Sequence, residues 1–187
     1  VDNVYFTGYV SNVRTVKGTA VYTAAFTPST TPLTAVSGTS LLTCQSNRFI
    51  DNSTNAFALT ATGSPSVQHF SPFNPTASYD TATIGGSGYF DGSGDYLSIA
   101  NNTAIDVGTG AFTYEGWMYR TSAASSDWRI FAGSASASGF FGGRGTYKFG
   151  IGRSNIAWDL ESTENAYKNN EWTHVVYVRD GSGNLSI

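Results

Sequence analysis

Residues 112–120 read FTYEGWMYR, and this stretch predicts a central strand of a β-sheet. Successive side chains of a strand point to opposite faces of the sheet. The alternation separates two sets, namely Tyr114, Gly116 and Met118 on one face and Glu115, Trp117 and Tyr119 on the other. Since both faces carry bulky groups, we expect one face in the core and the other on a partly covered or ligand-facing surface.

Short runs of β-branched and aromatic residues recur on both sides of this stretch, separated by Gly and Pro. We expect strands at residues 5–14, 41–44, 57–61, 88–91, 96–99, 112–120, 128–132, 148–152, 156–160, 173–179 and 185–187. Residues 63–78 are expected to form a loop, and residues 133–145 a mobile loop or a long hairpin. Many short strands with turns between them predict an all-β sandwich or barrel.

The composition limits the classes of function. The chain has 187 residues, enough for one all-β domain or one domain with an appendage. Charged residues make up 12%, about half the usual share, which predicts a neutral, hydroxyl-rich surface. A net charge of −3 without a basic patch argues against nucleic acid, and no apolar run reaches the ~20 residues of a membrane span. The single cysteine, Cys44, is expected to be a small buried hydrophobe.

The sequence DGSG occurs twice, at residues 91–94 and 180–183, and raises the question of a cation site. A calcium loop of the EF-hand type needs Gly at its sixth position and Glu at its twelfth. Counted from Asp91, these positions hold Tyr96 and Asn102. We therefore expect both stretches to be hairpin turns, in which Asp and Gly supply the unusual backbone angles.

Several motifs in one order suggest a family. They are LLTC (41–44), FIDNSTNAFALTATG (49–63), GSGYFDGSGDYLSI (86–99), FTYEGWMYR (112–120) and EWTHVVYVRDGSGNLSI (171–187). Together they resemble the laminin-G-like branch of the concanavalin-A-like lectin/glucanase superfamily. The resemblance implies an antiparallel jelly-roll β-sandwich, offset or incomplete at its C-terminal end.

The resemblance also implies a division of the chain. The stretch YFTGYVSNVRTVKG (5–18) looks like the closing strand of such a module. Residues 1–16 would then close a preceding or shared module, residues 17–39 would form a Thr/Pro-rich linker, and residues 40–187 a module lacking its last strands. Because an incomplete sheet exposes an unpaired edge, we expect residues 5–16 to pair beside residues 88–99, in the same chain or in a neighbouring copy.

Glucanases of this fold carry catalytic carboxylates two residues apart on one strand, on one face. The nearest stretch here is AWDLESTE (157–164), with Asp159, Glu161 and Glu164. Ala157 stands where the first glutamate would be. The motif is broken, and we therefore expect no enzyme.

Sugars pack an apolar face on aromatic rings while polar side chains bind their hydroxyls. The residues expected to bind carbohydrate are Trp128, Trp158, Tyr147, Arg153, Asp127 and Asp159. The alternative is that these tryptophans pack in the core, as expected for Trp117 and Trp172. Laminin-G-like domains often bind calcium through aspartates on a rim, so the resemblance leaves Ca²⁺ open as a cofactor, with Asp127 and Asp159 as candidate ligands.

The resulting hypothesis is a non-enzymatic structural or adhesive module of a repetitive extracellular or virion-associated fibre. The sequence is similar in kind to the repetitive fibre and structural proteins of marine bacteriophages, cyanophages especially. Its expected partners are neighbouring copies, through strand pairing, and surface glycans. A secreted glycan-degrading enzyme of the same fold and a structural spacer without ligand are the alternatives.

Overall fold

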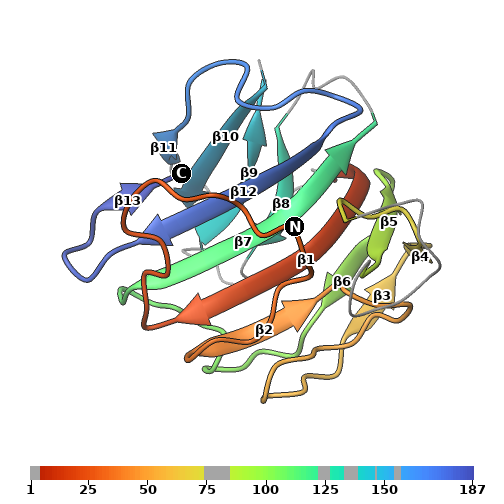
Figure 1. Cartoon of the computed structure of the whole chain (residues 1–187), viewed down its shortest axis with the longest axis horizontal. Helices are drawn as coiled ribbons and strands as arrows, with labels where there is room; N and C mark the ends of the chain where they lie inside the picture. Colours follow the sequence, from red (N-terminus) through yellow and green to blue (C-terminus); the bar gives the residue numbers. More distant parts are fainter. Residues whose placement is uncertain (1–4, 74–84, 122–126, 133–138, 146, 154–156) are drawn as a thin grey trace.

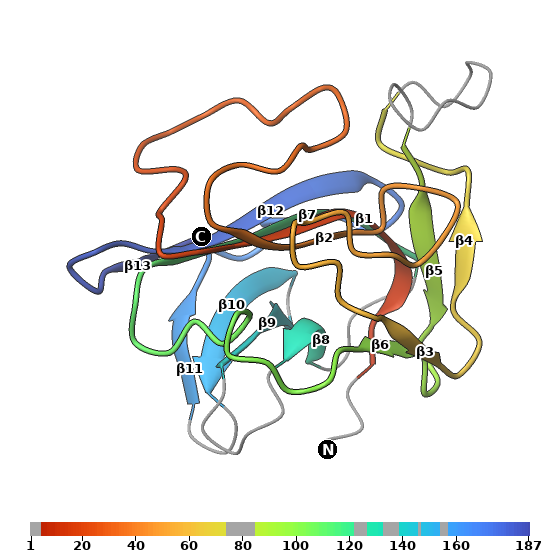
Figure 2. The ribbon, with the colours of Figure 1, turned by 90° about the horizontal axis from the view of Figure 1, so that it is seen from below.

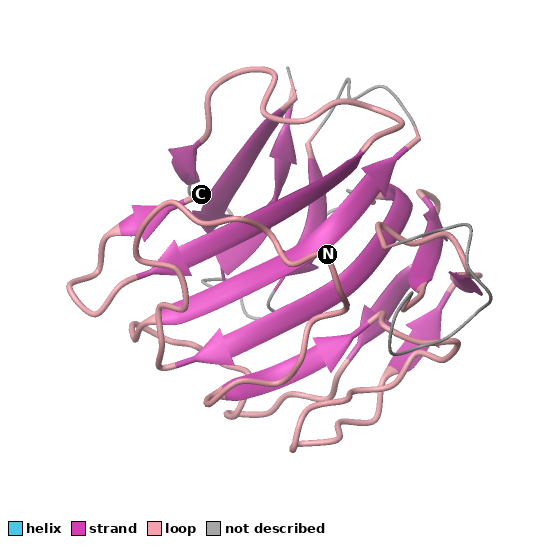
Figure 3. Ribbon diagram, viewed as in Figure 1, coloured by secondary structure: helices cyan, strands magenta, loops and turns pink. Residues whose placement is uncertain are grey.

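The computed structural model describes residues 5–73, 85–121, 127–132, 139–145, 147–153 and 157–187. These ranges hold strands and loops and no helix (Figure 3), so none of them forms a helix of the length and apolar character that crossing a membrane requires. The strands are β1 (Thr7–Lys17), β2 (Thr39–Thr43), β3 (Thr60–Thr62), β4 (Ser66–Gln68), β5 (Ser87–Asp91), β6 (Tyr96–Ser98), β7 (Phe112–Arg120), β8 (Trp128–Ala132), β9 (Gly139–Arg144), β10 (Lys148–Arg153), β11 (Ala157–Glu161), β12 (Trp172–Arg179) and β13 (Leu185–Ser186).

The strands form two layers (Figure 1). The large sheet has the order β13-β12-β7-β1-β5-β4, with β2 also paired to β1. The second sheet has the order β11-β10-β9-β8, and β3 pairs with β6 in a small sheet of two strands. Figure 2 shows the four-stranded sheet against one face of the large sheet. This all-β antiparallel sandwich confirms the predicted fold class.

The core lies between the two sheets and is rich in aromatic rings. Its buried members are Phe6, Val10, Phe112, Tyr114, Met118, Trp128, Phe141, Phe149, Ile151, Tyr167, Val175 and Tyr177. The predicted alternation of β7 is confirmed, because Tyr114 and Met118 face this core while Glu115 pairs with a side chain on the opposite face. Trp117 and Trp172, expected in the core, instead lie half-buried on that outer face, where Trp117 contacts Phe73.

Two tryptophans occupy space left by glycines in the four-stranded sheet. The Trp128 ring lies on the core side, where a β-carbon at Gly143 would overlap it. The Trp158 ring lies against Gly150, and a β-carbon there would overlap it as well. The sheet can carry both rings only because these backbone positions have no side chain.

The first strand lies in the middle of the large sheet. On one side β1 pairs with β7 along most of its length, and on the other it pairs with β5 and then β2. The expected pairing of residues 5–16 beside residues 88–99 is therefore present within the chain, at Thr7 to Val10 against Gly88 to Asp91. A bulge interrupts β1 at Asn12, whose φ is 54°.

Residues 18–38, which we call the strap, connect β1 to β2. In Figure 2 the strap lies on the face of the large sheet that is turned away from the four-stranded sheet. It contains no strand, and most of its side chains are exposed. The segment expected as an extended linker is thus a cover over the outer face of β7 and β12.

The structure also corrects expectations about turns and strand positions. The first DGSG turn is no hairpin, because β5 belongs to the large sheet and β6 to the small one, whereas the second joins the paired strands β12 and β13 as predicted. Strand β4 lies in a segment predicted to be a loop, and β3 covers residues 60–62 where a strand was predicted at 57–61, whereas β9, paired with β8, fits the hairpin alternative for residues 133–145. The glycines of β9 and the proline before β4 lower the strand propensity of these segments, so neither was among the predicted strands.

We expect Gly143→Ala to destabilise the protein by about 1–3 kcal/mol, since the new methyl group would overlap the buried Trp128 ring. Urea unfolding followed by circular dichroism would measure this. Gly181→Ala is the matched control, because no atom lies within 4 Å of a β-carbon there. Equal stability of the two variants would contradict this account of the sheet.

Candidate functional site

The outer face of the four-stranded sheet carries an aromatic platform. Trp158 on β11 lies half-buried against Gly150 of β10, and it meets Phe140 of β9 edge to face, with 4.9 Å between ring centroids. Arg129 of β8 lies over the ring of Phe140, with its guanidinium carbon 4.4 Å from the ring centroid. Phe149 and Ile151, which alternate with Gly150 on β10, face the core, so this platform faces outward.

An open hollow of about 350 Å³ lies beside the platform and is lined by Arg144, Gly145, Lys148 and Glu161. Glu161 is the Cα partner of Gly150, the residue under the Trp158 ring, so ring and hollow are neighbours on β10 and β11. The volume falls in the range of roughly 300–1,000 Å³ that small-molecule sites occupy. An apolar ring beside a polar hollow is the combination that a sugar needs.

Charged groups of both signs line the hollow. Arg144 Nη1 lies 2.5 Å from Glu161 Oε1, and Lys148 Nζ lies 3.6 Å from Glu161 Oε2 and 3.8 Å from Glu164 Oε1. The hydrogen bond from Arg144, with the charge of Lys148, holds the pKa of Glu161 below its ordinary value. At neutral pH the hollow therefore offers a fixed acceptor between two cationic donors.

Two of the predicted carbohydrate-binding aromatics pack inward. Trp128 is 1% exposed, belongs to the core, and donates from Nε1 to the Tyr167 hydroxyl at 2.9 Å. Tyr147 packs edge to face on Tyr167, 5.4 Å between centroids, against the same core. For Trp128 this placement fits the alternative that it packs in the core. Among the predicted carbohydrate-binding residues, Trp158 is the tryptophan on the outer face of the four-stranded sheet.

Of the three remaining predicted residues, the structure describes the side chains of Asp127 and Asp159. Asp127 is half-buried just before β8, where its charge acts on Arg144. Asp159 is exposed on β11 beside Trp158, and the side chain of Arg153 lies outside the described residues. Among the side chains that the structure describes, no three of His, Cys, Asp and Glu come together as metal ligands. The candidate calcium ligands Asp127 and Asp159 are therefore not part of such a group.

Sequence reasoning did not name Arg144 or Lys148 as binding residues. Arg144 ends β9, a strand that the glycines of GFFGGR concealed. A sequence-based clue existed in residues 148–152, KFGIG, where alternation puts Lys148, Gly150 and Gly152 on one face opposite two apolar residues. That pattern predicts an outer face open enough for a ring to lie on it.

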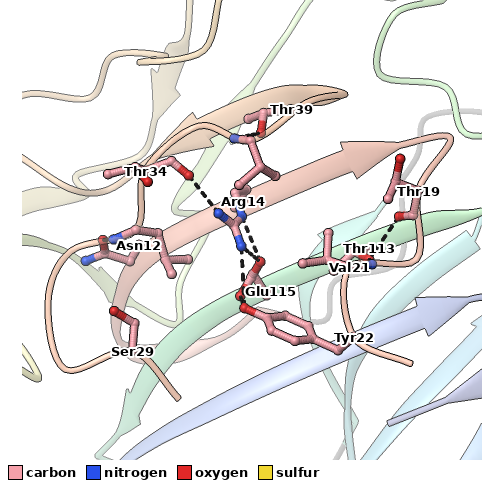
Figure 4. Close-up of polar contacts among 12 residues, drawn as sticks. Asn12, Arg14, Thr19, Val21, Tyr22, Ser29, Thr34, Thr39, Thr113 and Glu115 are labelled. Atoms are coloured by element: carbon pink, nitrogen blue, oxygen red, sulfur yellow. Dashed lines mark hydrogen bonds and ion pairs between the residues drawn. The ribbon is translucent and has the colours of Figure 1, made fainter. Parts of the chain in front are cut away.

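A second polar cluster lies on the outer face of the large sheet, under the strap (Figure 4). Arg14 of β1 donates from Nε to Glu115 Oε1 of β7 at 2.7 Å, and both side chains are almost fully buried. The Tyr22 hydroxyl of the strap donates to Glu115 Oε2 at 2.9 Å, and Arg14 Nη1 donates to the carbonyl of Thr34 at 2.6 Å. Arg14 and Glu115 thus hold the sheet and the strap together.

His174 of β12 completes this cluster. Its Nε2 atom lies 3.4 Å from Glu115 Oε2 without forming a hydrogen bond, and Phe26 of the strap covers the imidazole edge-on. Burial alone would raise the pKa of Glu115, but His174, Arg14 and Tyr22 outweigh it and hold that pKa below its ordinary value. Glu115 is therefore an ionised carboxylate sealed from solvent, which suits a structural role.

We expect Glu115→Gln to cost about 3–5 kcal/mol of stability at pH 7, because it leaves the Arg14 guanidinium buried without its counter-charge. The lowered pKa of Glu115 means that its stabilisation is present above the unfolded pKa of about 4.3 and is lost as the pH falls. Urea unfolding at pH 7 and at pH 3 should show a smaller difference between wild type and variant at pH 3.

The control for this prediction is Glu161→Gln, which removes a solvent-exposed ion pair and should cost less than about 1 kcal/mol. A loss at Glu115 that is no larger than the loss at Glu161 would show that the buried pair does not hold the strand.

A family model described as the concanavalin A-like lectin/glucanases superfamily matches residues 91–187, which include β6 to β13, the platform and the hollow. Searches of curated proteins and of solved structures gave no match. The family match and the all-β sandwich agree with the resemblance expected from the motifs. The chain therefore belongs to the concanavalin A-like lectin/glucanases superfamily.

Proposed function

We propose that the chain is a non-enzymatic carbohydrate-binding module, with its site at Trp158 and the adjoining hollow. The superfamily contains lectins and glucanases, which makes carbohydrate the expected ligand class. The observation that carries the proposal is the half-buried Trp158 ring, which lies on a glycine directly beside the hollow of Arg144, Lys148 and Glu161.

The two parts of the site suit the two sides of a sugar ring. The apolar face of a pyranose packs on the indole of Trp158, and its hydroxyls reach the charged groups of the hollow. Glu161 accepts hydrogen bonds from hydroxyls, while Arg144 and Lys148 donate them. Because the hollow holds charges of both signs, a neutral saccharide fits it best.

The carboxylates support binding rather than hydrolysis. A glycosidase needs one carboxyl with a raised pKa as general acid and a second as base or nucleophile. Contacts with Arg144 and Lys148 lower the pKa of Glu161. Contacts with His174, Arg14 and Tyr22 lower the pKa of Glu115, which is also sealed under the strap. Neither carboxyl is a proton donor at neutral pH.

The setting that we propose for the module is adhesive and structural, in a repetitive extracellular or virion-associated fibre whose neighbouring copies pair through strands. The order of the motifs and the Thr/Pro-rich strap support this setting. A spacer without a ligand would share the fold and lack the binding.

Glycan-array binding of the whole chain tests the site. Trp158→Ala should weaken binding to the preferred glycan at least tenfold, since one stacked ring contributes more than about 1.4 kcal/mol. Tyr96→Ala is the matched control, because Tyr96 is an exposed aromatic outside the site, and calorimetric titration would give the affinities. Unchanged binding by Trp158→Ala would place the glycan elsewhere, and an array without any bound glycan would favour the spacer.

We expect the chain to release no reducing ends from the glycans that it binds. A reducing-sugar assay over several hours at pH 5 and pH 7 measures this. Release by the wild type that is lost in Glu161→Gln would show the hydrolytic alternative to be right.

A further inference from the structure

Strand β1 is the only described connection between the two halves of the large sheet. On one side of it lie β7, β12 and β13, and on the other lie β5, β4 and β2. Phe6, which directly precedes β1, and Val10 of β1 are buried in the core, and Arg14 of β1 supplies the counter-charge of Glu115. Without β1 the sheet would expose two unpaired edges, a buried carboxylate and part of the core. The slot between β7 and β5/β2 therefore fits one occupant, the strand 7–17.

The connection from β1 to the rest of the chain is much longer than its geometry requires. Val16 of β1 and Thr39 of β2 are direct partners in an antiparallel pair, and such pairs are usually joined by 2–5 residues. The strap instead has 21 residues, from Gly18 to Gly38. Extended, it spans roughly 70 Å, which is enough to reach a second molecule of this size.

The strap is held to the body at both of its ends, and Phe26 also packs on His174 between them. Its first part is fixed by Tyr22 on Glu115 and by the Val21 amide, which donates to Thr113 Oγ1 at 3.0 Å. Its last part is fixed by the Leu33 amide, which donates to Asn12 Oδ1 at 2.8 Å. Between these anchors most side chains of residues 23–32 are exposed. A second copy presents the same anchors, so a strap that keeps them bridges two bodies with residues 23–32 alone, which span roughly 35 Å when extended.

We infer that β1 is an exchangeable strand, which inserts into the sheet of a second copy of this chain and is linked to its own body by the strap. Arg14 of one copy then pairs with Glu115 of the other, and every β1 contact is kept while only the chain connection changes. Such exchange of an identical element is a low-cost route to assembly. Mutual exchange gives a dimer, and exchange in one direction gives an open row of copies.

Exchange takes place while the chains fold. Withdrawing β1 from the folded sheet would break its ladders with β7, β5 and β2 together and uncover Glu115. Folded monomers therefore stay monomeric, whereas copies that fold side by side at high concentration exchange strands. The yield of dimer is set by the concentration at which the chain refolds.

Thr7→Cys combined with Asp91→Cys, in the full chain, reports where β1 lies. These residues are Cα partners across β1 and β5, and the roughly 5 Å between such partners suits a disulfide. The chain is refolded from urea under reducing conditions in two samples, one at low and one at high protein concentration. Each sample is oxidised only after folding. Burial raises the pKa of the Cys44 thiol to about 12, so the native cysteine stays unreactive at that stage.

The expected result is a dimer by size-exclusion chromatography after concentrated refolding, which runs as a covalent dimer on a non-reducing denaturing gel. Dilute refolding should give a monomer with an internal link. The absence of any dimer, or a dimer whose disulfides are all internal, would overturn strand exchange. Strand exchange needs no glycan, so either result leaves the Trp158 site to be judged by its own binding test.

Deletion of residues 19–37 in the same cysteine variant provides the control. It joins Gly18 to Gly38, both with φ of 82°, and leaves the three-residue turn Lys17-Gly18-Gly38 between the partners Val16 and Thr39, which suits a tight hairpin. Because such a glycine turn closes without strain, β1 of the shortened chain should close on its own body, and the shortened chain should be monomeric at both concentrations. A yield of covalent dimer from the shortened chain equal to that from the full chain would overturn the proposal. If the shortened chain does not fold, the proposal is decided by the disulfides of the full chain alone.

Discussion

The buried ion pair between Arg14 and Glu115 is the interaction on which the arrangement of the large sheet depends. It joins β1 to β7 at the place where a bulge at Asn12 shifts the register of the two strands. Desolvation makes such a pair a modest source of net stability, but a slipped register would leave both charges buried alone. The pair therefore selects one register for the strand that connects both halves of the sheet, and it supplies the anchors for Tyr22 and Thr34 of the strap.

The two outer faces of the sandwich consequently differ. On the large sheet, the strap seals a carboxylate, an imidazole and a guanidinium among aromatic rings. On the four-stranded sheet, charged groups remain at the surface beside Trp158. The same kinds of residue thus stabilise the fold on one face and are available to a ligand on the other, and the difference between them is access to solvent.

The strands and their two faces could largely be predicted from local sequence patterns, whereas the contacts between distant residues could not. The alternation in FTYEGWMYR correctly separated Tyr114 and Met118 from Glu115 and Trp117, because period two depends only on the neighbouring residues, but it did not show that Trp117 faces away from the core. The partner of Glu115 lies 101 positions away, and no local pattern indicates Arg14. Strand β9 was not among the predicted strands, since glycine is depleted in strands, although Gly143 of β9 and Gly150 of β10 are what allow the rings of Trp128 and Trp158 to lie on the sheet.

The match of Gly150 to Trp158 has a consequence for relatives of this protein. The indole occupies the volume that a side chain at position 150 would fill, so the two positions share one space. A relative with a larger residue at position 150 has no room for the ring, and selection on either position acts on the other. Glycine at 150 together with tryptophan at 158 should therefore be gained and lost as a pair during divergence, and the pair marks the lineages that kept this surface.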